Sequence, residues 1–201
     1  NIKPVWEKYG EGTPNVIIGI ADTGIWTKHP DIQSNYSESK SWITGISDEY
    51  PGSLPSTLFN ESDKDTISHG TGVAAIAAGR GEFLVKGVAP LCCIANYRIF
   101  EVIKLKDKYE YLGSTDSSKL KYSKFNKVDI INNSWGLPTN YVYQDKNILK
   151  WIKDCSKYGR NGRGILMIWA SGNKGDGWND KQVDYSTFDH ALNAIPTIVV
   201  G

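Results

Sequence analysis

The chain has 201 residues, of which 40% are hydrophobic and 22% charged, and its formal net charge is +1 at pH 7. A chain of this length can bury a substantial core, and we predict one domain over residues 1–201. The near-zero net charge gives no sign of a basic surface that would bind nucleic acid or an anionic membrane. No apolar run approaches the ~18 residues of a membrane-spanning helix. We therefore expect no nucleic-acid partner and no transmembrane segment.

Five short apolar runs predict buried strands. Strands that are buried on both faces of a parallel sheet read as continuous hydrophobic runs rather than as alternating ones. The predicted strands span residues 16–21, 94–100, 128–134, 164–170 and 197–201.

Three helices are predicted between these strands. Residues 69–78 are dominated by Gly, Ala and Val, so this helix can be approached closely and is expected to be buried. A Lys-rich helix is predicted over residues 115–127. Apolar residues recur at helical spacing over residues 148–158, and Gly159 can end that third helix.

The alternation of strands and helices predicts the fold class. We expect an α/β fold, a three-layer sandwich with a mainly parallel central sheet. Residues 37–65 and 172–184 are polar and lack periodicity, so they are predicted to be surface insertions.

The cysteine and histidine patterns argue against a disulfide framework and a zinc site. The three cysteines are an odd count, and Cys92 and Cys93 are adjacent in an apolar run, so buried thiols are expected. The three histidines lie far apart, without the spacing of zinc ligands.

Asp22 is the first candidate catalytic residue. It ends the first predicted strand and is followed by Thr23 and Gly24. A carboxylate in this position can accept the Nδ1 hydrogen of an imidazole, which fixes the tautomer of that ring. The alternative is a strand-end Asp that forms an Asx turn. An aspartic protease would need a second Asp-Thr-Gly triplet, and the chain has none.

His69 is the second candidate, and it opens the small-residue helix. A lone histidine is more often just a polar residue. Here, however, Asp22 precedes His69, and Asp followed by His is one of the chain orders of a Ser-His-Asp triad, in which Ser comes last. The two residues are therefore predicted to be part of such a triad.

Several segments, taken in order, resemble the subtilisin-like serine proteases (subtilases), and more closely their kexin and furin branch. The segments are Asp22-Thr23-Gly24 with His29-Pro30-Asp31, His69-Gly70-Thr71, Asn133-Ser134-Trp135-Gly136, the stretch Gly159-Arg160-Asn161-Gly162-Arg163-Gly164, and Trp169-Ala170-Ser171-Gly172-Asn173. The resemblance implies the subtilisin-like fold, with residues 1–201 forming the N-terminal two thirds of one catalytic domain.

The resemblance implies a serine endopeptidase with an Asp-His-Ser triad. In that mechanism Asp22 orients His69, His69 activates a serine, and Asn173 donates a hydrogen bond in the oxyanion hole. No serine of the chain has the family's Gly-Thr-Ser-Met context, so the nucleophile is expected beyond Gly201 and the isolated chain is expected to be inactive. Without the resemblance, Asn173 would be interpreted as a loop residue in a tight turn.

The resemblance also implies where a peptide substrate binds. Ser134, Trp135 and Gly136 would line the S1 pocket and pair with the backbone of an extended substrate. The facing wall would consist of Ala170, Ser171 and Gly172. The alternative for Trp135 is an aromatic residue of the core.

Specificity for basic residues rests on Asp184, which stands about where the family places an acid of the S1 pocket. The alternative is an exposed loop carboxylate. Thr23 and the stretch 137–140 depart from the pattern of the convertases, which counts against dibasic specificity.

The chemistry requires no cofactor, but the resemblance implies a structural calcium ion with Asp31 as a ligand. The loop expected to wrap that ion, residues 79–85, looks short and carries Arg80, and an Asp that caps a turn is the alternative. The implied partners are a polypeptide substrate, the C-terminal remainder of the catalytic domain, and a pro-segment or inhibitor, as in a zymogen. The implied location is secreted or within the secretory pathway.

Two other functions stay open at this point. One is a non-catalytic subtilase-like module that binds extended polypeptides through residues 134–136. The other is one chain of a cleaved two-chain enzyme, which keeps the catalytic interpretation. The sequence that follows Gly201 would discriminate between them, because a Gly-Thr-Ser segment before a helix restores the enzyme.

Overall fold

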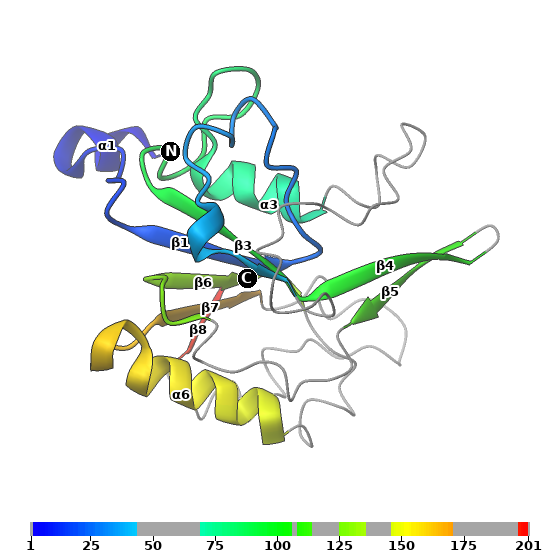
Figure 1. Ribbon diagram of the computed structural model, residues 1–201. Helices are drawn as coiled ribbons and strands as arrows, with labels where there is room; N and C mark the ends of the chain where they lie inside the picture. Colours follow the sequence, from blue (N-terminus) through cyan, green and yellow to red (C-terminus); the bar gives the residue numbers. More distant parts are fainter. Residues whose placement is uncertain are drawn as a thin grey trace, which may run out of the picture. The chain divides into compact units, whose positions relative to one another are not determined.

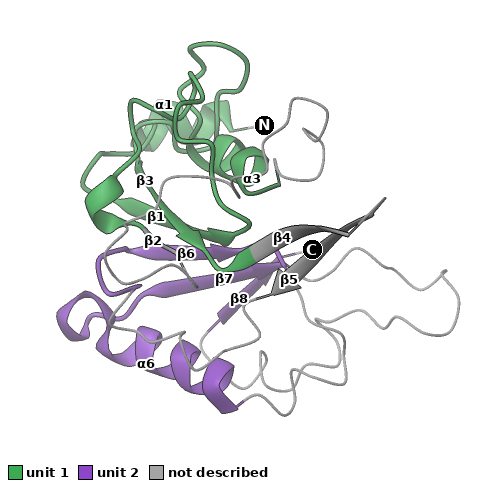
Figure 2. Ribbon diagram, turned by 45° about the vertical axis from the view of Figure 1, so that its right-hand side comes forward, with its two compact units in different colours: residues 1–115 green, residues 116–201 purple. Residues whose placement is uncertain are grey.

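A computed structural model of the chain describes residues 2–43, 69–105, 108–113, 125–135, 146–170 and 197–200. The chain divides into two compact units, residues 1–115 and 116–201 (Figure 2). Within the described ranges, no helix combines the length and apolarity that a membrane crossing needs.

The first unit is built on three parallel strands. β1 (Ile17–Asp22) pairs with β3 (Cys93–Arg98), and β3 pairs in turn with β2 (Trp42–Ile43). The helix α3 (His69–Ala78) packs against β1 and β3 (Figure 1). β1 is buried along nearly its whole length, which explains its continuous apolar sequence.

Predictions for β1, β3 and α3 are confirmed, the last with the predicted bounds. The predicted strand 94–100 was too long, because β3 ends at Arg98 and Phe100 begins the next strand. The predicted insertion 37–65 was wrong at its start, since the 3-10 helix η1 (Glu38–Lys40) and β2 lie there. A two-residue strand such as β2 is too short for a hydrophobic period to show in the sequence.

Three further elements of this unit were not predicted. β4 (Phe100–Leu105) and β5 (Lys108–Gly113) form an antiparallel hairpin. The helix α1 (Lys3–Tyr9) is a short element whose Trp6 Nε1 donates to the carbonyl of Val88 at 2.7 Å. That partner lies 82 residues away in sequence, so a tertiary contact that no local pattern reveals holds this helix.

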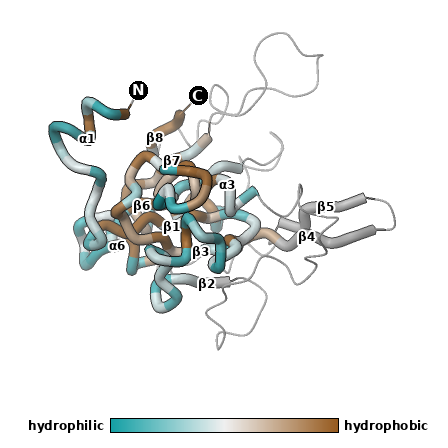
Figure 3. Tube along the Cα trace, turned by 90° about the horizontal axis from the view of Figure 1, so that it is seen from above, coloured by the Kyte–Doolittle hydropathy of each residue, from teal (hydrophilic) through white to brown (hydrophobic). Residues whose placement is uncertain are grey.

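The second unit also has three parallel strands. β6 (Ile130–Asn133), β7 (Leu166–Ala170) and β8 (Thr197–Val200) pair in this order, and α6 (Lys146–Gly162) connects the first two. β7 and β8 are largely hydrophobic, whereas α1 of the first unit is mostly hydrophilic (Figure 3). All three strands confirm predicted apolar runs.

The helix α6 confirms the predicted helix over residues 148–158. Ile148, Ile152 and Cys155 are buried, as their helical spacing predicts, whereas Tyr158, the fourth residue of that pattern, is 47% exposed. The regular helix ends at Gly159, whose ψ of 157° is not helical, and a Cβ there would lie 2.3 Å from Ile165 Cγ1. Most of the predicted helix 115–127, and all of the predicted insertion 172–184, lie outside the described residues.

Candidate active site

Asp22 and His69 lie side by side in the first unit. Asp22 is the last residue of β1, and His69 is the first residue of α3. The Nδ1 atom of His69 lies 2.8 Å from Oδ1 and 3.0 Å from Oδ2 of Asp22. The Asp22 side chain is 2% exposed and that of His69 is 49% exposed. The pair therefore joins a buried carboxylate to an imidazole that solvent can reach.

Small residues allow this close approach. A Cβ on Gly70 would lie 2.3 Å from the carbonyl oxygen of Gly24 and 3.2 Å from Asp22 Oδ1. Only glycine fits where the first turn of α3 meets the end of β1. The Gly residue after His69 therefore has a packing reason that is independent of any chemistry.

Two threonine hydroxyl groups link the same two segments. The backbone N–H of Gly70 donates to Thr23 Oγ1 at 3.2 Å, and the backbone N–H of Trp26 donates to Thr71 Oγ1 at 2.9 Å. Thr23 also donates its own backbone N–H to Asp22 Oδ1 at 2.7 Å. The first of these bonds satisfies one of the N–H groups that the start of a helix leaves unpaired.

The sequence motifs contain Thr23 and Thr71, but these motifs did not indicate that the two hydroxyl groups link the segments. Thr23 was noted only because it departs from the convertase pattern. The side chains of both residues are buried beside the candidate pair. The available indication was that Thr23 directly follows Asp22 and that Thr71 lies two residues after His69.

Asp22 sets the electrostatics of His69. The hydrogen bond from Nδ1 to Asp22 raises the pKa of His69, burial opposes this, and the Asp22 charge adds to the rise. A carboxylate accepts the Nδ1 hydrogen, so neutral His69 carries its lone pair on Nε2. The pair is thus set up to take a proton at Nε2 and to stabilise the imidazolium that forms.

Ser134 and Trp135 lie in the second unit, directly after β6. Asn132 Nδ2 donates to Ser134 Oγ at 2.8 Å, and Trp169 Nε1 donates to the carbonyl of Trp135 at 2.8 Å. The rings of Trp135 and Trp169 are 4.6 Å apart between centroids, in an edge-to-face arrangement. Trp135 thus has the aromatic packing of the core alternative, while its role in substrate binding stays a prediction.

The other predicted substrate residues are mostly outside the described part of the chain. Ala170 ends β7 and pairs with Val200 of β8. The undescribed positions are Gly136, Ser171, Gly172, Asn173 and Asp184. Their predicted roles stay predictions.

Asp31, the predicted calcium ligand, is fully buried. Its Oδ1 accepts the backbone N–H of Phe83 at 2.7 Å, and its Oδ2 accepts those of Leu84 and Val85 at 2.9 Å each. Burial raises the pKa of Asp31, but these three bonds and the charge of His29 outweigh it, so the pKa lies below its usual value. Calcium is held by six to eight oxygen atoms, and N–H donors do not fit such a set. Within the described residues, no group of three or more His, Cys, Asp and Glu side chains could hold a metal ion.

Comparison with models of known protein families shows which family the chain belongs to. A family model described as the Subtilase family matches residues 13–201. The chain belongs to the subtilase family. The predicted resemblance is therefore confirmed over nearly the whole chain.

Relatives of this subtilase include proprotein convertases, in accordance with the predicted kexin and furin branch. Neuroendocrine convertase 2 of Bos taurus is 31% identical over 180 residues, which are 87% of this chain and 26% of that protein. Proprotein convertase subtilisin/kexin type 6 of Homo sapiens is 28% identical over 212 residues, covering 100% of this chain and 19% of that protein. The chain thus spans about a quarter or less of the length of these relatives.

The fold is also shared with solved proteases. The prenylagaramide maturation protease PagA superposes with a TM-score of 0.61 at 22% identity, covering 99% of this chain and 66% of that one. This likeness and the parallel strands described above confirm the predicted α/β, subtilisin-like fold. The chain is a member of a serine peptidase family with that fold.

Proposed function

We propose that this subtilase is a serine endopeptidase in which Asp22 and His69 are two members of the catalytic triad. The observation that carries the proposal is the pairing of a buried Asp22 carboxylate with Nδ1 of a half-exposed His69. This geometry is what a general base needs: a fixed tautomer, a stabilised imidazolium and an accessible Nε2.

The proposed reaction is acyl transfer through a serine. The serine oxygen attacks the scissile carbonyl carbon while its proton moves to Nε2 of His69. Asn173 donates a hydrogen bond to the oxyanion that forms. His69 then protonates the leaving amine, and a water molecule, deprotonated by His69, hydrolyses the acyl-enzyme. We expect the nucleophilic serine outside residues 1–201, because no serine of this sequence has the family's Gly-Thr-Ser-Met context.

We place the peptide substrate along Ser134, Trp135 and Gly136, opposite Ala170, Ser171 and Gly172. Backbone pairing of this kind gives affinity, and pockets for side chains give specificity. A preference for a basic residue at P1 is supported by Asp184 and by the similarity to convertases. Secretion and synthesis as a zymogen remain predictions.

Peptide hydrolysis by the full-length protein tests this proposal. We expect cleavage of extended peptides with Arg at P1 to be faster than cleavage of the same peptides with Leu. Asp184→Asn should narrow that ratio, and His69→Ala should lower kcat/KM by about 10⁴-fold or more, because the general base is lost. Equal cleavage of both peptides would contradict the specificity alone. Unchanged cleavage by His69→Ala would contradict the mechanism, and no cleavage by the wild type would favour a polypeptide-binding module.

A further inference from the structure

The loop that follows α3, residues 79–87, is held by hydrogen bonds from the chain itself. It is a small closed hairpin: Arg80 and Lys86 form an antiparallel bridge, and the N–H of Gly81 donates to the carbonyl of Val85 at 3.1 Å. At its start, the N–H of Arg80 donates to the backbone carbonyl of Asp31 at 2.8 Å. Both the backbone and the side chain of Asp31 therefore hold this loop.

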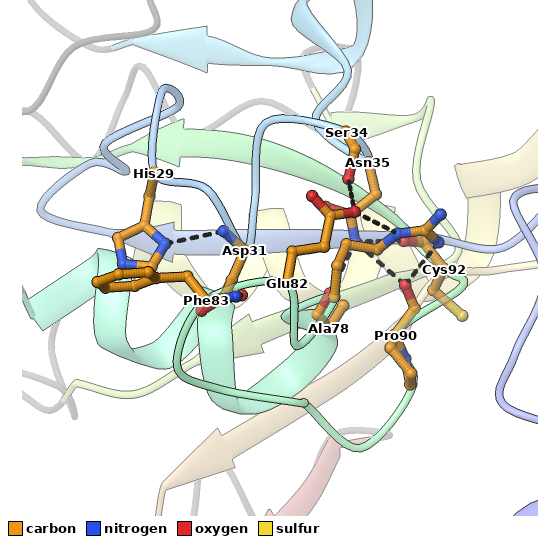
Figure 4. A network of polar contacts seen from close by, with 10 residues as sticks. His29, Asp31, Ser34, Asn35, Ala78, Glu82, Phe83, Pro90 and Cys92 are labelled. Carbon is orange, nitrogen blue, oxygen red and sulfur yellow. Dashed lines mark hydrogen bonds and ion pairs between the residues drawn. The ribbon is translucent and has the colours of Figure 1, made fainter.

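The side chain of Asp31 lies against the loop, beside Phe83 (Figure 4). Its two oxygens receive three consecutive backbone N–H groups, those of Phe83, Leu84 and Val85. Consecutive N–H groups that converge in this way form a concave site for an anion. Here the anion is a carboxylate of the protein.

The carbonyl oxygens at the end of α3 are also occupied. Four carbonyl groups at a helix C-terminus lack partners within the helix and are the oxygens that a cation could use. In this chain the last three carbonyl groups of α3, and that of Gly79 directly after it, accept N–H donors at 2.7–2.9 Å: Val88 N to Ile76 O, Ala89 N to Ala77 O, Asn35 Nδ2 to Ala78 O and Gly87 N to Gly79 O.

The positive charge beside the loop is the guanidinium group of Arg80, a residue of the chain itself. Arg80 donates from a guanidinium nitrogen to the carbonyl of Pro90 at 3.0 Å, and its Nε lies 3.9 Å from Glu82 Oε1. In the described part of this neighbourhood, Asn35 Oδ1 is a buried oxygen without a donor. One such oxygen is far from the six to eight that a calcium ion takes.

We propose that the Asp31 carboxylate holds the 79–87 loop of this subtilase in its conformation through these backbone N–H groups. The loop then needs no calcium ion to keep that conformation. The loop directly follows the helix that begins with His69. The C-terminal end of that helix is consequently fixed by the protein alone. This inference concerns the loop and does not depend on the proposed peptidase activity.

Amide hydrogen exchange of the full-length protein tests the inference. We expect the amide protection of Phe83, Leu84 and Val85 to be the same after chelation of divalent cations and in millimolar calcium. Asp31→Asn should speed exchange at these amides by about tenfold or more, because bonds to a charged acceptor are lost. Glu82→Gln is the matched control, since it removes an exposed carboxylate of the same loop and should leave these amides protected.

Two results would overturn the inference. One is a loss of protection at these three amides in the chelated wild type that calcium restores, a comparison that needs no variant to fold. The other is an Asp31→Asn protein in which exchange at these amides is unchanged. Neither result bears on whether the protein cleaves peptides, because catalysis is not measured.

Discussion

Asp22 and His69 differ in exposure, and that difference determines what each can do. The buried carboxylate has its oxygens directed at Nδ1 of His69 and at the N–H of Thr23. His69 is half exposed, so its other nitrogen can reach a reacting group. A strand-end Asp in an Asx turn would explain the Thr23 bond but not the position of His69 Nδ1, which lies 2.8 Å and 3.0 Å from the two carboxylate oxygens.

The raised pKa of His69 gives a prediction about pH. Asp22→Asn should lower the pKa of His69, because the carboxylate charge that raises it, and strengthens the hydrogen bond from Nδ1, is removed. A nuclear magnetic resonance titration of the His69 ring protons, with His29 as the internal reference, measures this directly. An unchanged His69 pKa in the variant would contradict the pairing.

The same pairing links stability to pH, with a definite sign. A histidine whose pKa is raised on folding contributes stability that is full below its unfolded pKa and is lost as pH rises through its folded pKa. Asp22→Asn should therefore lower the free energy of unfolding more at a pH below the unfolded pKa of His69 than at a pH above its folded pKa. Denaturant titrations at two pH values provide the comparison.

Thr23 is predicted to be a positioning residue for His69. Thr23→Val removes the acceptor of the Gly70 N–H while keeping the side-chain volume, and a buried N–H without a partner costs about 1–3 kcal/mol. We expect lower stability and a lower pKa of His69, with Thr23→Ser restoring both. If Thr23→Ser were impaired and Thr23→Val were not, packing of the methyl group, and not the hydroxyl, would be responsible.

At the level of elements, the contact between α3 and β1 depends on Gly70. Gly70→Ala would place a Cβ 2.3 Å from the Gly24 carbonyl oxygen and so push the start of the helix away from Asp22. We expect a loss of about 1–3 kcal/mol in unfolding free energy, as for other overpacked sites. The pKa of His69 should fall as well.

Gly72→Ala is the matched control in the same helix. A Cβ there meets nothing within 4 Å, so the variant should be neutral or gain about 0.5–1 kcal/mol from reduced backbone entropy. Thermal unfolding of the two variants side by side measures both effects. Equal behaviour would show that the close approach at Gly70 is unimportant.

The sequence predicted those elements whose pattern is local. A few neighbouring residues were enough to predict five strands from their apolar runs and one helix from its small residues. These elements are β1, β3, β6, β7, β8 and α3. β2 and α1 did not, because a two-residue strand has no period and α1 is held by the distant Val88.

The candidate site was only partly predictable for a similar reason. Asp22 and His69 were identifiable from motifs and chain order. The partners of Asp31 were not, because the N–H donors of a loop have no side-chain signature. The calcium prediction followed the family pattern, whereas the backbone around Asp31 supplies donors in place of oxygen ligands.

For the whole molecule, the residues proposed for catalysis and those proposed for substrate binding belong to different units. The first unit contains the Asp22 and His69 pair, and the second contains Ser134, Trp135 and Ala170 of the proposed substrate segments. The family match runs through both units, from residue 13 to residue 201. The proposed reaction additionally requires a serine nucleophile, which we predict to lie outside these residues.

The proposal that Asp22 and His69 activate a serine is tested by labelling the full-length protein with a fluorophosphonate. This reagent reacts covalently with activated serines. We expect rapid labelling of one serine in the wild type, located outside residues 1–201, and loss of that labelling in His69→Ala. The matched control His29→Ala, at a histidine outside the proposed triad, should keep it. Labelling of His69→Ala at the wild-type rate, or of a serine within residues 1–201, would contradict the account.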